Sequence, residues 1–223
     1  MKRTMKSPHT PQRTVCTVLA AAALAAGLSA CAPLIVGGAV VGGVMAVDRR
    51  TAGTQIEDEG IELRAANRIR EALGDRAHVN VTSYNRQALL TGEVATAQDR
   101  QAVEQMVSQV ENVRSVVNDL AVMPPSTLSQ RSTDTFITGK VRASLVDAQD
   151  ISANSFKVVT ERNTVYLMGR VSQREANRAT DIARGVTDVR KVVRVFEIVS
   201  EEELRRIAPQ PAPVTTDTKP AGG

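Results

Sequence analysis

The chain has 223 residues, which is enough for one ordinary domain or for two small ones. It contains two tyrosines, three phenylalanines and no tryptophan, so a core must be built from aliphatic side chains. This composition argues against an enzyme with an aromatic-lined pocket and against a protein that stacks single-stranded nucleic acid on aromatic rings. The net charge of +4 is matched by four basic residues close to the N-terminus, namely Lys2, Arg3, Lys6 and Arg13. Without them the charges balance, and no nucleic-acid partner is expected.

Residues 1–30 have the composition of a secretory signal peptide. A basic segment precedes an apolar run from Val15 to Leu28, which is shorter than the about 20 residues that a membrane-spanning helix needs. The run ends in Leu28-Ser29-Ala30-Cys31, which resembles the lipobox of bacterial lipoproteins. This resemblance implies cleavage before Cys31 and attachment of a diacylglyceryl group and a fatty acyl chain such as palmitate. Because Ala32 follows Cys31, it also implies a lipid anchor in the outer membrane, with the protein facing the periplasm.

Residues 31–56 are interpreted as the lipidated cysteine and an apolar tether. Positions 32–47 include four glycines, and each disfavours a helix by about 1 kcal/mol relative to alanine. We therefore expect an extended tether near the bilayer surface, with a true transmembrane segment as the alternative. The other cysteine, Cys16, would be removed with the signal peptide, so no disulfide is expected in the mature chain.

The remainder of the chain contains an internal repeat. The segment 88–94, Ala-Leu-Leu-Thr-Gly-Glu-Val, corresponds to 165–171, Val-Tyr-Leu-Met-Gly-Arg-Val. After a deletion of one residue, the segment 110–117 corresponds to 186–193. In the helix that precedes each hairpin, we pair Ile69 with Val141 and Leu73 with Leu145. This pairing places Arg64 opposite Phe136.

Each copy has the pattern of an αββαβ unit. The first helix has apolar residues at i, i+4 and i+8, which are Ala65, Ile69 and Leu73 in one copy and Ile137, Val141 and Leu145 in the other. Two alternating strands follow, and the polar pairs Asn85-Arg86 and Arg162-Asn163 predict a tight turn between them. A second helix and a third strand complete the copy. The helix begins with a predicted capping box, Thr96 with Asp99 and Ser172 with Glu175.

Gly92 and Gly169 occupy the same place near the end of the second strand. We interpret them as sites of close backbone approach rather than as ligand-binding residues.

The repeated unit resembles the BON domain. The shared marks are the Leu-x-Gly-x-Val segment of the second strand and the Val-x-x-Val-Val strand after the second helix. Two such units behind a lipobox are similar to the dual-BON outer-membrane lipoproteins of Gram-negative bacteria. The resemblance implies an α+β fold with two tandem αββαβ domains, each a three-stranded sheet packed by two helices. The predicted division is signal peptide 1–30, lipidated tether 31–56, first BON domain 57–123, linker 124–131, second BON domain 132–200 and disordered Pro/Thr-rich tail 201–223.

The first helix of the second copy carries the candidate binding residues. Phe136 lies about 100° from the core-facing stripe, with Lys140 one turn further along the helix. An exposed aromatic ring beside cations suits the interface of a bilayer with anionic headgroups. The resemblance implies the same role, because the second domain of the family binds anionic phospholipid such as phosphatidylglycerol through this helix. The predicted phospholipid-binding residues are Phe136, Ile137, Lys140 and Arg142.

Two alternatives remain open at this point. Phe136 could pack against the first domain or the linker instead of facing a membrane. The protein could also be an adaptor for an outer-membrane assembly or secretion complex, with an envelope protein as its partner and Phe136 at the interface. A structural role in osmotic stress is a third class, which predicts neither lipid nor protein binding.

Catalytic motifs are missing from the sequence. His78 belongs to no motif and is interpreted as a half-exposed polar residue. The acidic run Glu57-Asp58-Glu59 lacks the spacing of an EF-hand and is interpreted as a solvated helix start. We therefore expect a protein that is not an enzyme and that uses no cofactor or metal ion.

Overall fold

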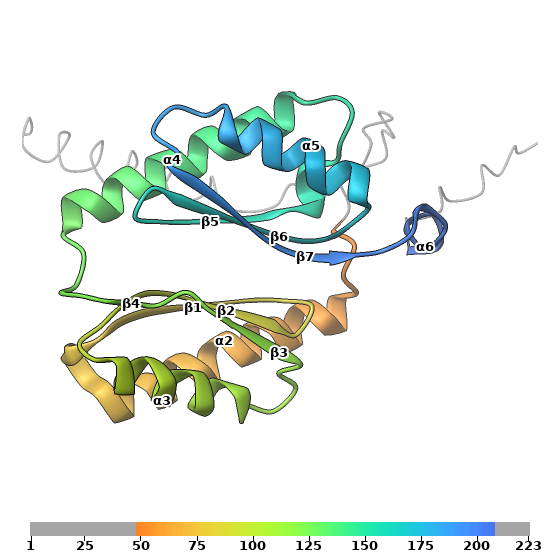
Figure 1. Cartoon of the computed structure of the whole chain (residues 1–223). Helices are drawn as coiled ribbons and strands as arrows, with labels where there is room; N and C mark the ends of the chain where they lie inside the picture. Colours follow the sequence, from red (N-terminus) through yellow and green to blue (C-terminus); the bar gives the residue numbers. More distant parts are fainter. Residues whose placement is uncertain (1–47, 208–223) are drawn as a thin grey trace, which may run out of the picture. The chain divides into compact units, whose positions relative to one another are not determined.

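A computed structural model describes residues 48–207. The predicted signal peptide, the lipidated Cys31 and most of the predicted tether lie outside these residues, as does the chain from residue 208 onward. None of the described helices is both long enough and apolar enough to cross a membrane. The described residues form two consecutive αββαβ domains (Figure 1).

Domain 1 has one mixed sheet covered by two helices. Its elements are α2 (Ala52–Leu73), the 3₁₀ turn η2 (Gly74–Arg76), β1 (His78–Tyr84), β2 (Gln87–Val94), α3 (Ala97–Ser108), β3 (Ser115–Asn118) and β4 (Ala121–Val122). Strand β2 is central, because β1 pairs with it antiparallel and both β3 and β4 pair with it parallel. The third strand of the predicted unit is thus broken into β3 and β4.

Domain 2 repeats this arrangement with an unbroken third strand. Its elements are α4 (Leu128–Asp147), the 3₁₀ turn η3 (Ala153–Ser155), β5 (Lys157–Glu161), β6 (Thr164–Val171), α5 (Gln173–Arg184) and β7 (Lys191–Ile198), followed by α6 (Glu201–Ile207). Strand β6 is central, with β5 antiparallel and β7 parallel to it. The predicted α+β fold with two αββαβ units is confirmed. Helix α6 occupies residues 201–207, so the prediction of a disordered tail beginning at residue 201 is wrong for this segment.

Both first helices begin earlier than the domain boundaries expected from the sequence. Helix α2 begins at Ala52 rather than near residue 57, and α4 begins at Leu128 rather than near residue 132. In each case a threonine caps the helix, because the side chains of Thr51 and Thr127 accept the N–H of the residue three positions further on.

The second helices begin where the capping pattern predicts. Thr96 accepts the N–H of Asp99, and Ser172 accepts the N–H of Glu175. Only Glu175 also reaches back to the backbone N–H of its N-cap, at 3.0 Å. The Asp99 carboxylate, which is one methylene shorter, instead accepts the hydroxyl of Thr96 at 2.8 Å.

The two hairpin turns are held by an aspartate of the preceding helix. Asn85, Arg86 and their counterparts all have positive φ, which is the geometry of a tight two-residue hairpin. Asp58 accepts the backbone N–H groups of Asn85 and Arg86, each at 2.8 Å. Asp134 accepts those of Arg162 and Asn163, also at 2.8 Å. Asp58 is 1% exposed, so its interpretation as part of a solvated run is wrong.

These aspartates correct the pairing of the two first helices. If Asp58 corresponds to Asp134, the core residues Ile61, Ala65 and Ile69 correspond to Ile137, Val141 and Leu145. The pairing from the sequence was therefore wrong by one helical turn. A second contact agrees: Arg64 donates to the carbonyl of Glu111, and Lys140 donates to that of Thr187, the equivalent residue after the second helix.

The residue opposite Phe136 is consequently Gly60, not Arg64. The apolar residues predicted to form the core face of each first helix are buried, which confirms that part of the prediction; they are Ala65, Ile69, Leu73, Ile137, Val141 and Leu145. The repeat therefore preserves the inward face of the helix and varies its outward face.

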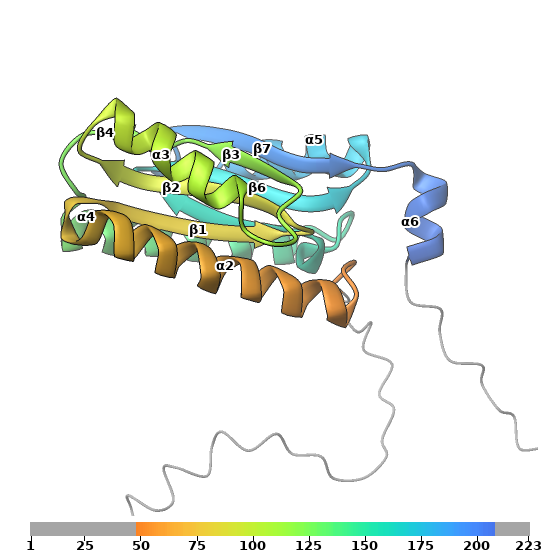
Figure 2. The ribbon, with the colours of Figure 1, turned by 90° about the horizontal axis from the view of Figure 1, so that it is seen from below.

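The two sheets pack against each other through the faces that the helices leave free (Figures 1 and 2). Helices α2 and α3 cover one face of the first sheet, and α4 and α5 cover one face of the second. A third apolar cluster fills the space between the sheets, made of Tyr84, Leu89, Tyr166, Met168 and Val195. Strand β2 is therefore buried along nearly its whole length, because both of its faces are covered.

Polar contacts also join the domains. The hydroxyl of Tyr166 donates a hydrogen bond to the carboxylate of Asp119 at 2.6 Å. Asp119 lies between β3 and β4. Lys157 pairs with Glu62 at 2.7 Å. These polar contacts supplement the apolar cluster, to which Tyr166 itself belongs.

Two arginines just before α2 connect to both domains. Arg49 makes a two-pronged ion pair with Glu175 at the start of α5, with distances of 2.7 and 2.8 Å. Arg50 pairs with Asp58 at 2.8 Å, and its guanidinium lies 4.3 Å from the centroid of the Tyr84 ring. The segment that leads out of the predicted tether is thus held by both domains.

Candidate functional site

Helix α4 presents one face to the core of domain 2 and the opposite face to solvent. Phe136 lies on the outer side and is 66% exposed. Ile137, the next residue, is fully buried among the core side chains of domain 2. Ile137 is therefore wrong as a lipid-contacting residue, because consecutive residues of a helix point about 100° apart and only one of these two faces outward. Its role is to hold α4 on the sheet.

Lys140 lies one turn from Phe136 on the same side of the helix. Its ammonium group is 5.0 Å from the centroid of the Phe136 ring, within the range of a cation–π interaction. The same group pairs with the carboxylate of Asp188 at 2.9 Å and donates to the carbonyl of Thr187 at 3.0 Å. Lys140 is thus partly neutralised and held beside the ring.

Arg142 differs from Lys140 in having an exposed guanidinium that makes no hydrogen bond or ion pair with any residue in 48–207. It lines a cavity of about 360 Å³ near the C-terminal end of α4, together with Asp48, Val146 and Asn154, but it forms no ion pair with Asp48. Of the two predicted cations, Arg142 is therefore the one that is available to an external anion.

Two further apolar residues of α4 are exposed, and the sequence analysis did not single them out. Leu128 and Val146 have exposed fractions of 79% and 67%. They are five helical turns apart and so lie on one side of the helix, next to the side that carries Phe136. The signal that could have identified them is the presence of large apolar residues outside the core-facing stripe.

A groove separates α4 from α5 beside Lys140. It has a volume of about 560 Å³ and is lined by residues of both helices, including Lys140, Ala143, Arg178, Ile182 and Val186. The lining also includes Asp181, and both of its basic side chains are already paired, Lys140 with Asp188 and Arg178 with Asp150.

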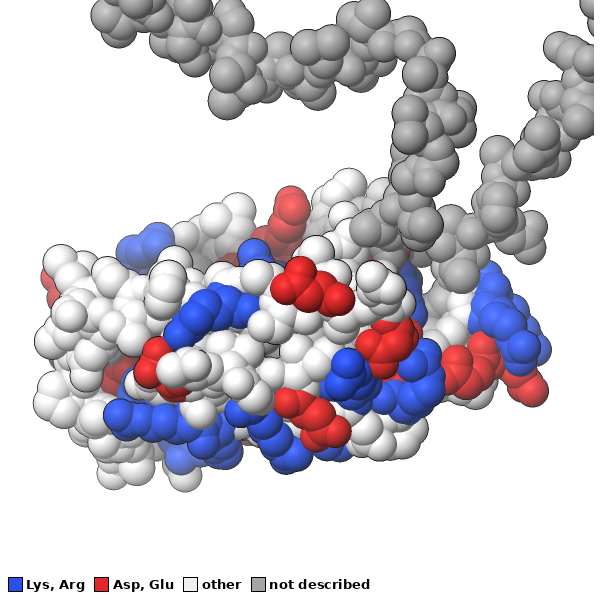
Figure 3. Space-filling view, turned by 90° about the horizontal axis from the view of Figure 1, so that it is seen from above, with Lys and Arg blue, Asp and Glu red and all other residues white. Residues whose placement is uncertain are grey.

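The two domains carry opposite net charge. Residues 128–200 contain twelve basic and eight acidic side chains, whereas residues 52–123 contain seven basic and eleven acidic ones. The balance of charge in the chain after residue 30 thus conceals an excess of positive charge on domain 2. Figure 3 shows the side of the molecule formed by α4 and α5, where basic and acidic side chains lie among uncharged ones and in places touch each other.

Domain 1 lacks this combination. With the corrected pairing, the positions of Leu128, Phe136, Arg142 and Val146 are taken in domain 1 by Ala52, Gly60, Ala66 and Arg70. Helix α2 does expose two apolar residues of its own, Ile56 and Leu63, at other positions. The outward surface of α4 is therefore specific to the second copy of the repeat.

Comparison with known proteins places this fold in a family. The family model described as the BON domain matches residues 61–124 and 133–200. The chain is 35% identical over 172 residues to the outer membrane lipoprotein DolP of Haemophilus influenzae, covering 76% of this chain and 89% of that protein. It is 34% identical over 155 residues to a 21 kDa hemolysin of Actinobacillus pleuropneumoniae, covering 69% of this chain and 80% of that protein.

Among solved structures, CdsD, a structural protein of the type III secretion system of Chlamydia trachomatis, covers 69% of this chain and 96% of its own length. The identity is 14% and the TM-score is 0.28, a likeness too low to support an inference.

The two ranges matched by the family model correspond to the two αββαβ domains of the structure. The match to the outer membrane lipoprotein extends over most of both chains. The chain therefore belongs to the BON-domain family and is an outer-membrane lipoprotein with two BON domains in tandem.

Proposed function

We propose that this lipoprotein binds anionic phospholipid through helix α4 of its second BON domain and thereby supports the integrity of the outer membrane. The observation that carries the proposal is the outward face of α4. The outer surface of α4 has an exposed ring at Phe136 and, about 120° further round the helix, an exposed guanidinium at Arg142 that forms no ion pair within residues 48–207, on a domain with an excess of positive charge. Nothing in it requires catalysis, and we propose a binding role rather than an enzymatic one.

The chemistry of each residue fits a contact with a membrane surface. The Phe136 ring would enter the headgroup region, with Leu128 and Val146 adding apolar contact along the same helix. Arg142 would meet a lipid phosphate, for which a guanidinium offers paired donors. Lys140 already forms an ion pair with Asp188, so its main role would be to hold the Phe136 ring in position.

This contact is expected to be weak by itself. Basic residues near an anionic surface contribute about 1 kcal/mol each. The lipid anchor at Cys31 would hold domain 2 near the bilayer, so that even a weak contact is formed for much of the time. The affinity of α4 for anionic headgroups would then decide where in the membrane the protein gathers.

The proposal is tested by vesicle flotation with a fragment of residues 48–208, which lacks the anchor and contains every residue of the apolar clusters. We expect the fragment to float with vesicles that contain phosphatidylglycerol and not with vesicles of phosphatidylcholine alone. Phe136→Glu should abolish flotation, and Arg142→Glu should reduce it severalfold. Leu63→Glu is the matched control, because it places the same charge at an exposed apolar position of domain 1.

Circular dichroism of each variant shows whether it is folded. If a folded wild-type fragment ignored both kinds of vesicle, or if Leu63→Glu reduced flotation as much as Phe136→Glu, lipid binding by α4 would be ruled out. The exposed apolar residues of α4 would then favour the adaptor function, with an envelope protein as the partner.

A further inference from the structure

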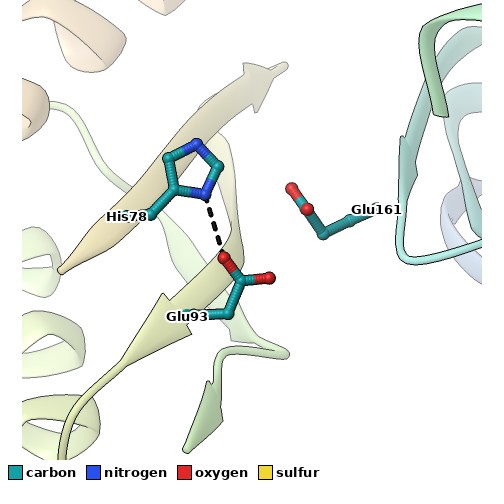
Figure 4. Close-up of side chains that lie close together, drawn as sticks. All are labelled: His78, Glu93 and Glu161. Carbon is teal, nitrogen blue, oxygen red and sulfur yellow. Dashed lines mark hydrogen bonds and ion pairs between the residues drawn. The ribbon is translucent and has the colours of Figure 1, made fainter. Parts of the chain in front are cut away.

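Three side chains with metal-binding atoms converge between the two domains. His78 and Glu93 face each other across β1 and β2, and His78 Nδ1 lies 3.0 Å from Glu93 Oε2. Glu161 reaches the same place from the end of β5 in domain 2. One donor atom from each of the three residues lies within 4.8 Å of the other two. Figure 4 shows the Glu161 carboxylate pointing across the gap toward His78 and Glu93.

Burial makes the negative charge of Glu161 costly unless a cation is near it. Glu93 is 1% exposed and Glu161 is 4% exposed. The hydrogen bond formed by the Glu161 carboxylate within residues 48–207 comes from a neutral amide, Asn80 Nδ2, at 3.0 Å. No basic side chain of the described chain forms an ion pair with Glu161. Buried carboxylates are normally paired with a cation or coordinate a metal ion.

We propose that His78, Glu93 and Glu161 form a binding site for a divalent transition-metal ion, Zn²⁺ above all, that links the two BON domains. One imidazole and two carboxylates form a ligand set that zinc accepts, with a water molecule completing four-coordination. Two carboxylates also neutralise a divalent ion. The imidazole disfavours Mg²⁺ and Ca²⁺, which prefer sets of oxygen ligands alone.

The distances are compatible with this role. Ligand atoms at about 2.0–2.2 Å from a tetrahedral zinc ion lie about 3.3 Å apart. The His78–Glu93 separation of 3.0 Å is close to this value. Glu161 lies within 4.8 Å of the other two and would have to come closer for the three to share one ion.

The neighbouring groups leave room for an ion. Arg162 approaches the other oxygen of Glu93, Oε1, at 3.4 Å, and also donates to the carbonyl of Gly92 at 3.1 Å. The N–H of Ser126 donates to Glu93 Oε2 at 3.0 Å, and this bond orients the carboxylate that would bind the ion. The guanidinium and the ion would thus engage different oxygens of Glu93.

An entry path is also present. His78 and Glu161 line a cavity of about 330 Å³ between β1, α4 and β5, together with the charged residues Arg131 and Asp134 of α4. The place in the interface that the repeat relates to this one lacks the ligand set, because the corresponding positions carry Ser155, Arg170 and Tyr84. A bound ion would hold the end of β5 against β1 and β2. The position of domain 2 relative to domain 1 would then depend on whether the ion is bound.

The test uses the full mature lipoprotein, purified in detergent without a polyhistidine tag. In the chain processed before Cys31, His78 is the single histidine. We expect equilibrium dialysis against Zn²⁺ to give one bound ion per chain, unaffected by excess Mg²⁺. His78→Gln and Glu161→Gln should each weaken binding at least tenfold. Glu71→Gln, which alters an exposed acid of α2, should leave binding unchanged.

A second measurement needs no variant. In the ¹⁵N spectrum of the imidazole of His78, Zn²⁺ should shift the Nδ1 signal, since that atom faces Glu93. The absence of saturable binding would overturn the proposal. Binding that survives both ligand substitutions, or that leaves the His78 signals unchanged, would also overturn it by placing the ion elsewhere.

Discussion

Gly92→Ala is expected to lower the free energy of unfolding by about 3 kcal/mol, combining backbone strain with a steric clash. Gly92 has a φ of 108°, and a Cβ at this position would collide with the carbonyl oxygen of His78 on β1. Strand β2 cannot move away, because helices cover one of its faces and the second sheet covers the other. Urea unfolding followed by far-UV circular dichroism measures the loss.

Gly139→Ala is the matched control. Gly139 lies within α4, and a Cβ there meets no atom within 4 Å. This substitution should raise the free energy of unfolding by about 0.5–1 kcal/mol, because alanine is the better helix former. Equal unfolding curves for the two variants would show that the contact between Gly92 and His78 is not as tight as the structure indicates.

Asp58→Asn is expected to be the second most damaging change, at about 3 kcal/mol, because it breaks a buried ion pair together with its hydrogen bonds. Asp58 pairs with Arg50 and accepts the hydroxyl of Ser83 at 2.6 Å, besides holding the first hairpin turn. An uncharged amide cannot satisfy all these donors. Glu59→Gln, at the exposed neighbouring position, should change stability by less than about 0.5 kcal/mol.

The same carboxylate makes stability depend on pH. Burial by itself would raise the pKa of Asp58, but hydrogen bonds from Ser83, Arg86 and Arg50 outweigh it and hold the pKa below the ordinary value of 3.8. A carboxyl whose pKa is lower in the folded state stabilises the fold fully above its unfolded pKa, and this contribution is lost as the pH falls. The urea midpoint of the wild type should therefore drop on acidification below about pH 4, and that of Asp58→Asn should drop less. Parallel curves for the two proteins would contradict this assignment.

The two copies of the repeat have diverged where they face outward. Their inward residues, including the paired aspartates Asp58 and Asp134, hold the same hairpin turns and the same helix positions. On the outward face of the first helix, domain 1 has the small residue Gly60 at the position where domain 2 has the large residue Phe136. The shared core can support this difference on the outer face without itself changing.

Local patterns of residues predicted much of this fold. The αββαβ order, the hairpin turns, the N-caps of the second helices and the core stripes of the first helices all depend on neighbours within one element or one turn. The structural interpretation of Gly92 and Gly169 is also supported, since a Cβ at either position would strike the backbone of the adjacent segment.

The pairing of the two first helices was wrong because their apolar pattern is periodic. A helix with apolar residues every four positions matches its copy equally well when it is shifted by one turn, so the sequence could not distinguish Arg64 from Gly60 as the partner of Phe136. The bonds from Asp58 and Asp134 to the hairpin turns remove this ambiguity. Ile137 was misjudged for a related reason, because proximity in sequence to Phe136 does not mean a shared face.

The sequence by itself thus determined the family, the repeated unit and the residues that build each core, because these depend on periodicity and on short spacings. Only the tertiary structure decided which outer residues of α4 are free, that the two sheets bury each other, and that His78 and Glu93 meet Glu161. The physical reason is that burial and pairing in these places come from contacts between segments that are distant in the chain. A local pattern of residues does not show which distant side chain forms the contact.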